Sequence, residues 1–199
     1  DLKHFDDNYL KINSRTYIEG YFTSHLYFKQ HEHIIRNEFK FKEEPSPLNK
    51  LLIEKVKNQN SICISIRRGN FVNNTLHDVC RLDYFYAACK LLTEKIECPV
   101  FYVFSDDIEW TKNNFRIQQE HYFMTHNFPD FYEDFRIMQN CRFHIIPNST
   151  FSWWAAWLCQ YESKIVIAPK HWLNSKEIDF SDFVPENWIK MDHDINTKF

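Results

Sequence analysis

The sequence predicts an α/β fold built on a parallel sheet over residues 61–190. Short, almost continuously apolar stretches rich in β-branched residues, such as residues 61–66 and 99–104, are typical of strands buried on both faces. Amphipathic stretches with helical spacing, such as residues 82–96, lie between them. Buried strands that alternate with helices indicate a Rossmann-like domain.

The other expected elements follow in order along the chain. Residues 1–44 are mixed and aromatic, with a helical stretch near residues 31–39. Pro45 and Pro47 interrupt it, because a proline disfavours helix at the residue before it. A short helix is expected at residues 48–57. Further strands are expected at residues 121–124, 143–146 and 164–168, and further helices at residues 108–115, 130–140 and 151–160.

Composition excludes several classes of protein. The 199 residues carry 24 Lys and Arg against 27 Asp and Glu, a net charge of −3, which argues against nucleic acid as the main partner. Only two glycines are present, Gly20 and Gly69, so the chain holds neither a P-loop nor a GxGxxG fingerprint. A bound nucleotide would therefore be held by arginines and a helix N-terminus. No apolar run approaches the roughly 20 residues of a membrane helix.

No pattern of metal ligands stands out. Six cysteines are scattered without a C-x-x-C spacing, which favours reduced, structural thiols in a cytosolic protein. His31 and His33 are two residues apart, a spacing that splays their rings on a helix. Asp192-His193-Asp194 falls in a polar C-terminal tail, where we expect it to be solvated. The sequence thus predicts no metal and no other cofactor.

Residues suited to chemistry follow the predicted strands directly. In a parallel sheet, ligands bind at the carboxyl ends of the strands, so these residues are expected to meet at one edge. They are Arg67-Arg68-Gly69-Asn70, Ser105-Asp106-Asp107, Asn148-Ser149-Thr150-Phe151-Ser152 and Lys170-His171-Trp172.

Each of these groups has a functional and a structural interpretation. Arg67 and Arg68 suit phosphate oxygens, with one gripping a ligand and the other bracing the loop, but both could be plain surface residues. Gly69 favours the first interpretation, because a tight turn or a close approach needs glycine. Asp106 or Asp107 could act as a general base or bind a sugar hydroxyl, or could cap the next helix.

A functional and a structural interpretation also exist for residues of two further predicted helices. Ser149 and Thr150 could simply cap a helix, or the helix start could bind an anion. Asp134, inside the preceding helix, could point outward or toward the base of a bound nucleotide. The tryptophan pair Trp153-Trp154 is more typical of a core than of a sugar platform.

The motifs together resemble a known family. The segment Ser65-Ile66-Arg67-Arg68-Gly69-Asn70-Phe71 is similar to the HxRRGDY segment of the bacterial α-1,2-fucosyltransferases, glycosyltransferase family 11. Further resemblances follow in the same order along the chain: residues 104–107 with Trp110, residues 134–141, residues 148–158, and residues 166–169 with Trp172. Residues 17–22 resemble the stretch that this family carries before its arginine motif.

The resemblance implies a fold and an activity. It implies a two-domain GT-B enzyme that inverts configuration without a metal, moving L-fucose from GDP-fucose to the 2-hydroxyl of a terminal galactoside. Residues 1–60 would be the end of the acceptor-side domain and a linker, 61–190 the GDP-sugar-binding domain, and 191–199 a tail. The donor GDP-fucose and a galactose-terminated oligosaccharide are the implied partners, and the implied location is cytoplasmic, with a peripheral place at the inner membrane left open.

The resemblance also implies roles for individual residues. Arg67, with Arg68, would hold the β-phosphate, and Asn148, Ser149, Thr150, Phe151 and Ser152 would form the helix-start part of the donor site. Asp134 would hydrogen-bond guanine, and Asp106 or Asp107 would lie near the transferred sugar. Arg67, Asp106 and Asp107 are the catalytic candidates.

Two departures from the family pattern are visible. Ser65 and Asn70 replace the family histidine and aspartate, and the Asn70 amide cannot take up a proton. The glycine-rich segment that opens the family's sequences has no counterpart, so we expect this chain to begin in mid-protein and to bind donor without turnover. Two alternatives stay open: a catalytically inactive module that binds a GDP-sugar or a glycan, and a fucosyltransferase of another linkage.

Overall fold

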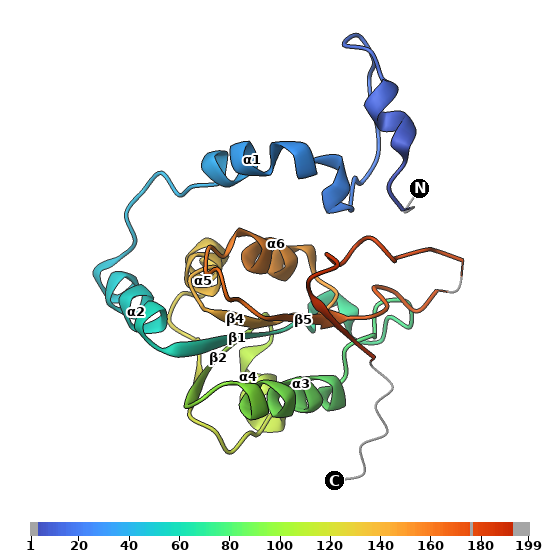
Figure 1. The fold of residues 1–199 in the computed structure, drawn as a ribbon. Coiled ribbons are helices and arrows are strands. Elements are labelled where there is room, and N and C mark those ends of the chain that lie inside the picture. The colour runs from blue at the N-terminus through green and yellow to red at the C-terminus, as the bar shows by residue number, and fades with distance from the viewer. Residues whose placement is uncertain (1–3, 176, 193–199) are drawn as a thin grey trace.

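The computed structural model describes residues 4–175 and 177–192 and forms a Rossmann-like α/β layer structure (Figure 1). Its sheet contains six strands, all parallel, in the order β3-β2-β1-β4-β5-β6. The strands are β1 (Asn60–Ile66), β2 (Pro99–Ser105), β3 (His121–Phe123), β4 (Phe143–Ile145), β5 (Val166–Pro169) and β6 (Ile189–Met191). The predicted α/β class and parallel sheet are confirmed.

Helices cover both faces of the sheet. The α-helices are α1 (Glu32–Glu38), α2 (Pro47–Asn58), α3 (Leu82–Lys95), α4 (Ile108–Asn114), α5 (Phe131–Met138) and α6 (Thr150–Leu158). Short 3-10 turns are η1 (Asp7–Lys11), η2 (His25–Tyr27), η3 (Lys29–His31) and η4 (Gly69–Phe71). Helices α3 and α4 lie on one face, and α5 and α6 lie on the other (Figure 1).

Alternating side chains of β1 explain why two cores form. Ile62, Ile64 and Ile66 face α3 and belong to one apolar cluster with Phe85. Cys63, which lies between Ile62 and Ile64 in β1, faces the other side of the sheet. It packs in a second cluster with residues of α2, α5 and α6. Because neighbouring side chains of a strand point to opposite faces, a strand covered on both sides must be apolar throughout.

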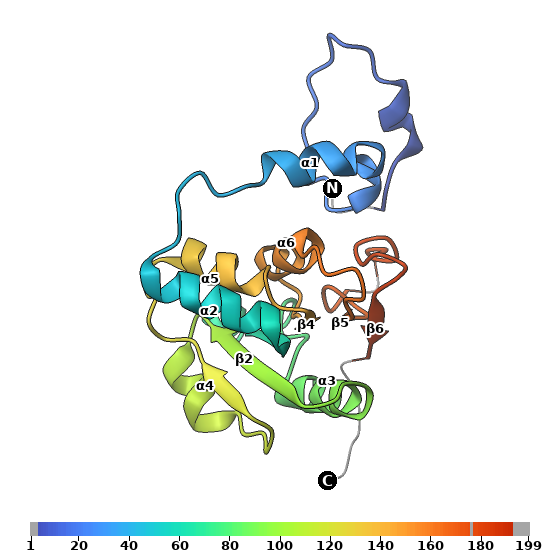
Figure 2. The same ribbon diagram turned by 60° about the vertical axis from the view of Figure 1, so that its left-hand side comes forward.

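The N-terminal segment packs over α6 (Figures 1 and 2). Trp154 of α6 is stacked against Phe28 and Phe39, with ring centroids 5.3 and 5.1 Å away. The Arg36 guanidinium of α1 lies 3.8 Å from the centre of the Trp157 ring and donates a hydrogen bond to the Trp157 carbonyl at 2.6 Å. Cation–π contact and aromatic stacking therefore attach this segment to the sheet domain.

A partly buried lysine holds the C-terminal end of α6. Lys164 Nζ donates to the carbonyl oxygens of Ala156, Trp157 and Cys159 at 2.8, 3.0 and 2.8 Å. These are carbonyls that the end of a helix leaves without an intrahelical partner, and the negative end of the helix dipole attracts a cation. Helix α6 is therefore fixed at its end, and its start points toward the carboxyl ends of the strands.

Two sequence predictions need correction. The strand expected at residues 164–168 begins only at Val166, because Lys164 turns to the end of α6; the helix expected at residues 151–160 ends at Leu158. The sequence analysis also missed β6, which pairs with β5 at the edge of the sheet. A three-residue edge strand is too short to produce a readable period. The division at residue 60 stays a prediction, and His193 and Asp194 of the predicted tail lie outside the described residues.

Two further expectations concern reduced cysteines and the length of apolar segments. All six cysteines are free thiols. Within residues 4–175 and 177–192, the structure contains no helix with the length and apolar character needed to span a bilayer.

His144 of β4 makes the fold sensitive to acid. The side chain is fully buried, and neither ring nitrogen has a hydrogen-bond partner among the described residues. Desolvation, with the nearby Lys164 charge, lowers the pKa of His144 from 6.5 to about 3. Between these two values the unfolded chain binds a proton that the folded chain does not, so stability falls as the pH falls from 6.5.

We expect His144→Phe to flatten this acid dependence. A pH of about 5 lies about 1.5 units below the ordinary pKa of histidine. At that pH, burial of His144 should lower the free energy of unfolding by about 2 kcal/mol relative to neutral pH. Urea denaturation of the wild type and the variant at neutral pH and at about pH 5 measures the difference. Equal losses of unfolding free energy in the two proteins would contradict the prediction.

Candidate functional site

The chain turns back across its sheet between β1 and β4. From β1 it proceeds outward to β2 and β3, and then crosses to the other side for β4, β5 and β6. Helices that leave neighbouring strands in opposite directions open a crevice at the carboxyl ends. A cavity of about 610 Å³ lies there. Its walls include residues that follow β1, β2, β4 and β5 and part of α5: Ser65, Arg67, Asn70, His77, Asp106, Phe131, Tyr132, Asp134, Asn148, Ser149, Thr150, Phe151, Ser152 and Trp172.

Arg67 is a cation on the cavity wall. Its Nη1 lies 2.7 Å from Asp106 Oδ2, and its Nη2 donates to Asn70 Oδ1 at 2.9 Å. The side chain is still 38% exposed, so the guanidinium is oriented without being covered. The Asn70 side chain keeps an oxygen in contact with Arg67.

Arg68 turns to different partners. Its guanidinium stacks 3.3 Å from the centre of the Trp110 ring, and its Nε lies 3.1 Å from Asp107 Oδ2. Asp107 is the N-cap of α4 and accepts a hydrogen bond from Trp110 N at 3.3 Å. Neither Arg68 nor Asp107 belongs to the wall of the cavity described above. Arg68 lines a smaller neighbouring cavity of about 260 Å³ that Arg67 also lines, and its contacts with Trp110 and Asp107 brace the loop.

Asp106 links the two loops that follow β1 and β2. Besides its pair with Arg67, it accepts a hydrogen bond from Arg68 N at 2.8 Å. Gly69 has no positive φ, so a left-handed backbone is not what requires a glycine there. A Cβ atom at Gly69 would instead clash with Asp106 Oδ2. The close approach of this carboxylate is therefore the reason for the glycine.

The start of α6 has free donors. Its N-cap is Ser149, whose side chain makes no capping hydrogen bond, so the interpretation of this serine as a capping side chain is not borne out. Ser152 is instead buried and its Oγ lies 2.7 Å from Ser65 Oγ, which ties the helix to the end of β1. The first backbone N–H groups of a helix, together with the positive end of its dipole, form an anion site.

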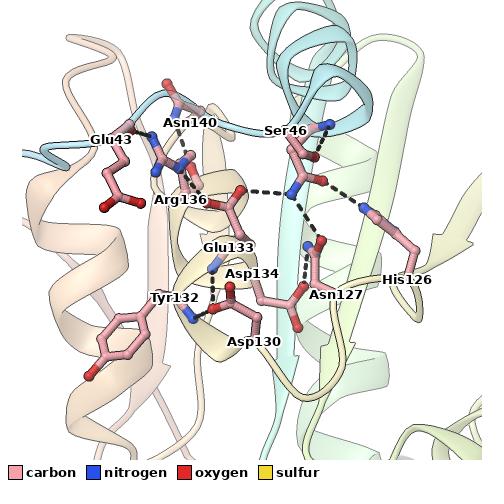
Figure 3. Close-up of polar contacts among 11 residues, drawn as sticks. Glu43, Ser46, His126, Asn127, Asp130, Tyr132, Glu133, Asp134, Arg136 and Asn140 are labelled. Carbon is pink, nitrogen blue, oxygen red and sulfur yellow. Dashed lines mark hydrogen bonds and ion pairs between the residues drawn. The ribbon is translucent and has the colours of Figure 1, made fainter.

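Asn148 and Asp134 lie on different walls of the cavity. Asn148 is 3% exposed, and its amide donates to the carbonyls of His77 and Trp172 at 3.2 and 2.9 Å. It therefore joins loops, and its side-chain donors are used internally. Asp134 lies on α5 and accepts from Asn127 Nδ2 at 2.9 Å (Figure 3). Burial raises the pKa of Asp134, and the hydrogen bond from Asn127 opposes that change.

Comparison with known proteins identifies the family. The family model Glycosyl transferase family 11 matches residues 1–192. The chain belongs to glycosyl transferase family 11. The family predicted from the motifs is thus confirmed.

Three curated relatives of this family 11 chain differ in their stated activities. An alpha-1,2-colitosyltransferase of Escherichia coli is 34% identical over 87% of this chain and 61% of its own length. The O-antigen biosynthesis glycosyltransferase WbnK of Escherichia coli is 31% identical over 92% of this chain and 63% of its own. A galactoside 2-alpha-L-fucosyltransferase of Caenorhabditis elegans is 25% identical over 87% and 52%. No solved structure matches significantly.

The coverage limits what the family implies for this chain. The chain spans about three fifths of the length of the two Escherichia coli relatives. Glycosyl transfer is therefore given as the activity of the family. The donor, acceptor and linkage of this chain are proposed below.

Some cavity residues of this family 11 chain were missed from the sequence. His77 lines the cavity and stacks on Phe71, with ring centroids 4.7 Å apart. Phe131 and Tyr132 begin α5 beside Asp134, and the spacing of Phe131 from Asp134 was a usable signal, because residues three apart share a helix face. No pattern around His77 marked it, because its place depends on how a loop folds.

Two further expectations concern metals and tryptophans. Among the described residues, no group of three or more His, Cys, Asp or Glu side chains is arranged to hold a metal ion. Trp153 is 6% exposed and belongs to the core, as expected, whereas Trp154 is partly buried and packs against that core.

We expect Gly69→Ala to destabilise the protein, because its methyl group forces Asp106 away from Arg67. Weakening the contacts of the Asp106 carboxylate with Arg67 and with Arg68 N costs about 1–2 kcal/mol of unfolding free energy. Gly20→Ala is the matched control: its Cβ would meet only the Phe22 ring at 3.5 Å, an ordinary contact. That variant should be unchanged or more stable by up to about 1 kcal/mol. Urea denaturation measures both, and equal effects at the two glycines would refute the assignment.

Proposed function

We propose that this chain is the GDP-sugar-binding part of a GT-B, inverting glycosyltransferase that moves L-fucose to the 2-hydroxyl of a terminal galactoside. The observation that carries the proposal is that Arg67 and the uncapped start of α6 line the same cavity. A fixed cation and free helix N–H groups suit a diphosphate. Membership of glycosyl transferase family 11 supports the reaction class.

The proposed reaction needs charge stabilisation more than it needs a metal. The acceptor oxygen attacks the anomeric carbon of the sugar, the bond from that carbon to the phosphate oxygen breaks, and GDP leaves with its negative charge on the β-phosphate. Arg67 and the N–H groups at the start of α6 would stabilise that charge. Removing one preorganised donor of this kind costs about 3 kcal/mol, or about 100-fold in rate.

The proton of the acceptor hydroxyl requires a base. Asp106 and His77 both line the cavity, so either can approach an acceptor there. The Asp106 carboxylate already accepts from Arg67 and from Arg68 N, which favours a role in orienting Arg67. Asp107 caps α4 and pairs with Arg68, so it is the weaker of the two aspartate candidates.

The relatives' names support the linkage and leave two donor sugars in view. An alpha-1,2-colitosyltransferase and a galactoside 2-alpha-L-fucosyltransferase share position 2 in their names. Colitose and L-fucose are both 6-deoxy-L-galactose sugars that differ by one hydroxyl group at carbon 3. The name of the relative in O-antigen biosynthesis supports a cell-surface glycan as the product.

A second candidate function is a GDP-sugar-binding module without transferase activity. The observation that favours it is Asn70, whose amide replaces the family aspartate and is held by Arg67 at 2.9 Å. An amide can orient the arginine but cannot act as a base.

Arg67→Ala should weaken GDP binding at least about tenfold, a loss of about 1.4 kcal/mol, because the cation on the phosphate wall is removed. Calorimetric titration of GDP, GDP-fucose and UDP in the presence of EDTA measures it. Arg116→Ala is the control, since Arg116 is exposed, precedes β3 and does not belong to the wall of the cavity. Unchanged GDP affinity in Arg67→Ala would contradict the phosphate assignment.

We expect the complete gene product to transfer L-fucose from GDP-fucose to lactose, forming a bond to the galactose 2-hydroxyl. The assay compares GDP-fucose with GDP-colitose and analyses the linkage of each product. A preference for GDP-colitose would contradict L-fucose as the proposed donor sugar. A bond formed at another hydroxyl would contradict the proposed linkage. Donor binding without any product would favour the inactive module.

A further inference from the structure

A partly buried chain of side-chain hydrogen bonds leads to Asp134, which lines the cavity (Figure 3). It begins at Asn49 in the first turn of α2, which is 1% exposed. Asn49 Nδ2 donates to Asn127 Oδ1 at 2.9 Å, and Asn127 Nδ2 donates to Asp134 Oδ1 at 2.9 Å. At Asn49, helix α2 is therefore joined to the loop after β3 and to α5, which lie more than 70 residues further along the chain, by amides that lead to one carboxylate.

The direction of these hydrogen bonds is fixed by charge. Asn49 Nδ2 also contacts Glu133 Oε2 at 2.7 Å, and Glu133 is paired with Arg136 at 3.0 Å. An ionised carboxylate only accepts, so Nδ2 of Asn49 must face it and Oδ1 must face the other way. His126 Nε2 lies 2.7 Å from that Oδ1 and therefore carries the proton.

Every link consequently donates toward Asp134. His126 donates to Asn49, Asn49 to Asn127, and Asn127 to Asp134. Asp134 accepts its donor on Oδ1, and Asp134 belongs to the wall of the cavity, whereas Asn127 does not. Oδ2 accepts no hydrogen bond from the described residues. A hydrogen bond to the charged form keeps a carboxyl group ionised, and an ionised carboxylate can only accept.

We infer that Asn127 and Asn49 are positioning residues that hold Asp134 as an acceptor for the N–H groups of a purine, and that they thereby set a preference for guanine. The inference rests on the proposed function, in which the cavity holds a GDP-sugar. Guanine offers two adjacent donors, the ring N1–H and the exocyclic amine. Adenine presents an acceptor at N1, which an ionised carboxylate repels, and a site built around one hydrogen-bonding pattern strongly rejects the other.

The acidity of Asp134 makes the inference testable. Burial raises the pKa of Asp134, and the largest opposing effect is the hydrogen bond from Asn127. The His126 ring also lowers it, whereas the charges of Asp130 and Glu133 raise it. Guanine binding needs the ionised form, so affinity is lost as the pH falls through the pKa of Asp134. Without Asn127 the loss begins at a higher pH.

The experiment is calorimetric titration of GDP and ADP into the 199-residue chain between about pH 5 and 8, for wild type and Asn127→Ala. We expect the ratio of GDP to ADP affinity to fall at least about tenfold in the variant. The pH at which GDP affinity is half lost should rise. Asn49→Ala should change both in the same direction by less, because Asn49 acts through Asn127.

The matched control is Asn140→Ala. Asn140 lies just after the same helix and donates to the Arg136 carbonyl at 2.7 Å, outside the chain of amides that reaches Asp134. It should leave the nucleotide ratio and the pH profile unchanged. A purely structural link between α2 and α5 would weaken both nucleotides alike without moving the pH profile.

The outcomes separate this inference from the function on which it rests. If wild type prefers GDP and Arg67→Ala weakens it, but Asn127→Ala keeps the nucleotide ratio and pH profile within about twofold, the inference fails alone. If wild type binds no GDP, or binds ADP equally well, both fail. A lowered ratio and a raised pH midpoint in Asn127→Ala, with Asn140→Ala unchanged, support both.

Discussion

The site depends on the placement of α6, which is held at both ends. At its start, the hydroxyl groups of Ser152 and Ser65 are 2.7 Å apart and tie the helix to the end of β1. At its end, Lys164 Nζ donates to three carbonyls, and Arg36 reaches the Trp157 carbonyl. With both ends fixed, the free N–H groups of the first turn point into the crevice between β1 and β4. A helix start is useful to an anionic ligand only if it cannot move away from it.

The loops that follow β1 and β2 divide the work between two adjacent arginines. Arg68 is used by the protein itself, against Trp110 and Asp107, and Arg67 remains on the cavity wall. Asp106 serves both loops, and it approaches so closely that Gly69 has no room for a side chain. The Asp106 carboxylate thus decides where the cation of the site lies. The Arg67 side chain is still 38% exposed although it is paired with Asp106.

Much of this arrangement could be predicted from the amino acids. The buried strands, the helices between them and the edge at which Arg67, Asp106 and Ser149–Ser152 gather follow from hydrophobic periodicity and from the rule that parallel strands present ligands at their carboxyl ends. His77 and the amides of Asn49 and Asn127 were not predictable. Their positions depend on contacts between segments as far apart in sequence as Asn49 and Asn127, and no local pattern encodes such a meeting.

The sequence by itself determined the α/β class, the family and the residue types available at the sheet edge, because these depend on period and local motif. Only the tertiary structure decided that Arg67 lines the cavity beside Asp106, that the Ser149 side chain makes no capping hydrogen bond, and that Asp134 lines the cavity and accepts from Asn127. The physical reason is that a hydrogen bond or ion pair has a partner and a direction. Both are fixed only when the strand order β3-β2-β1-β4-β5-β6 brings distant loops to one place.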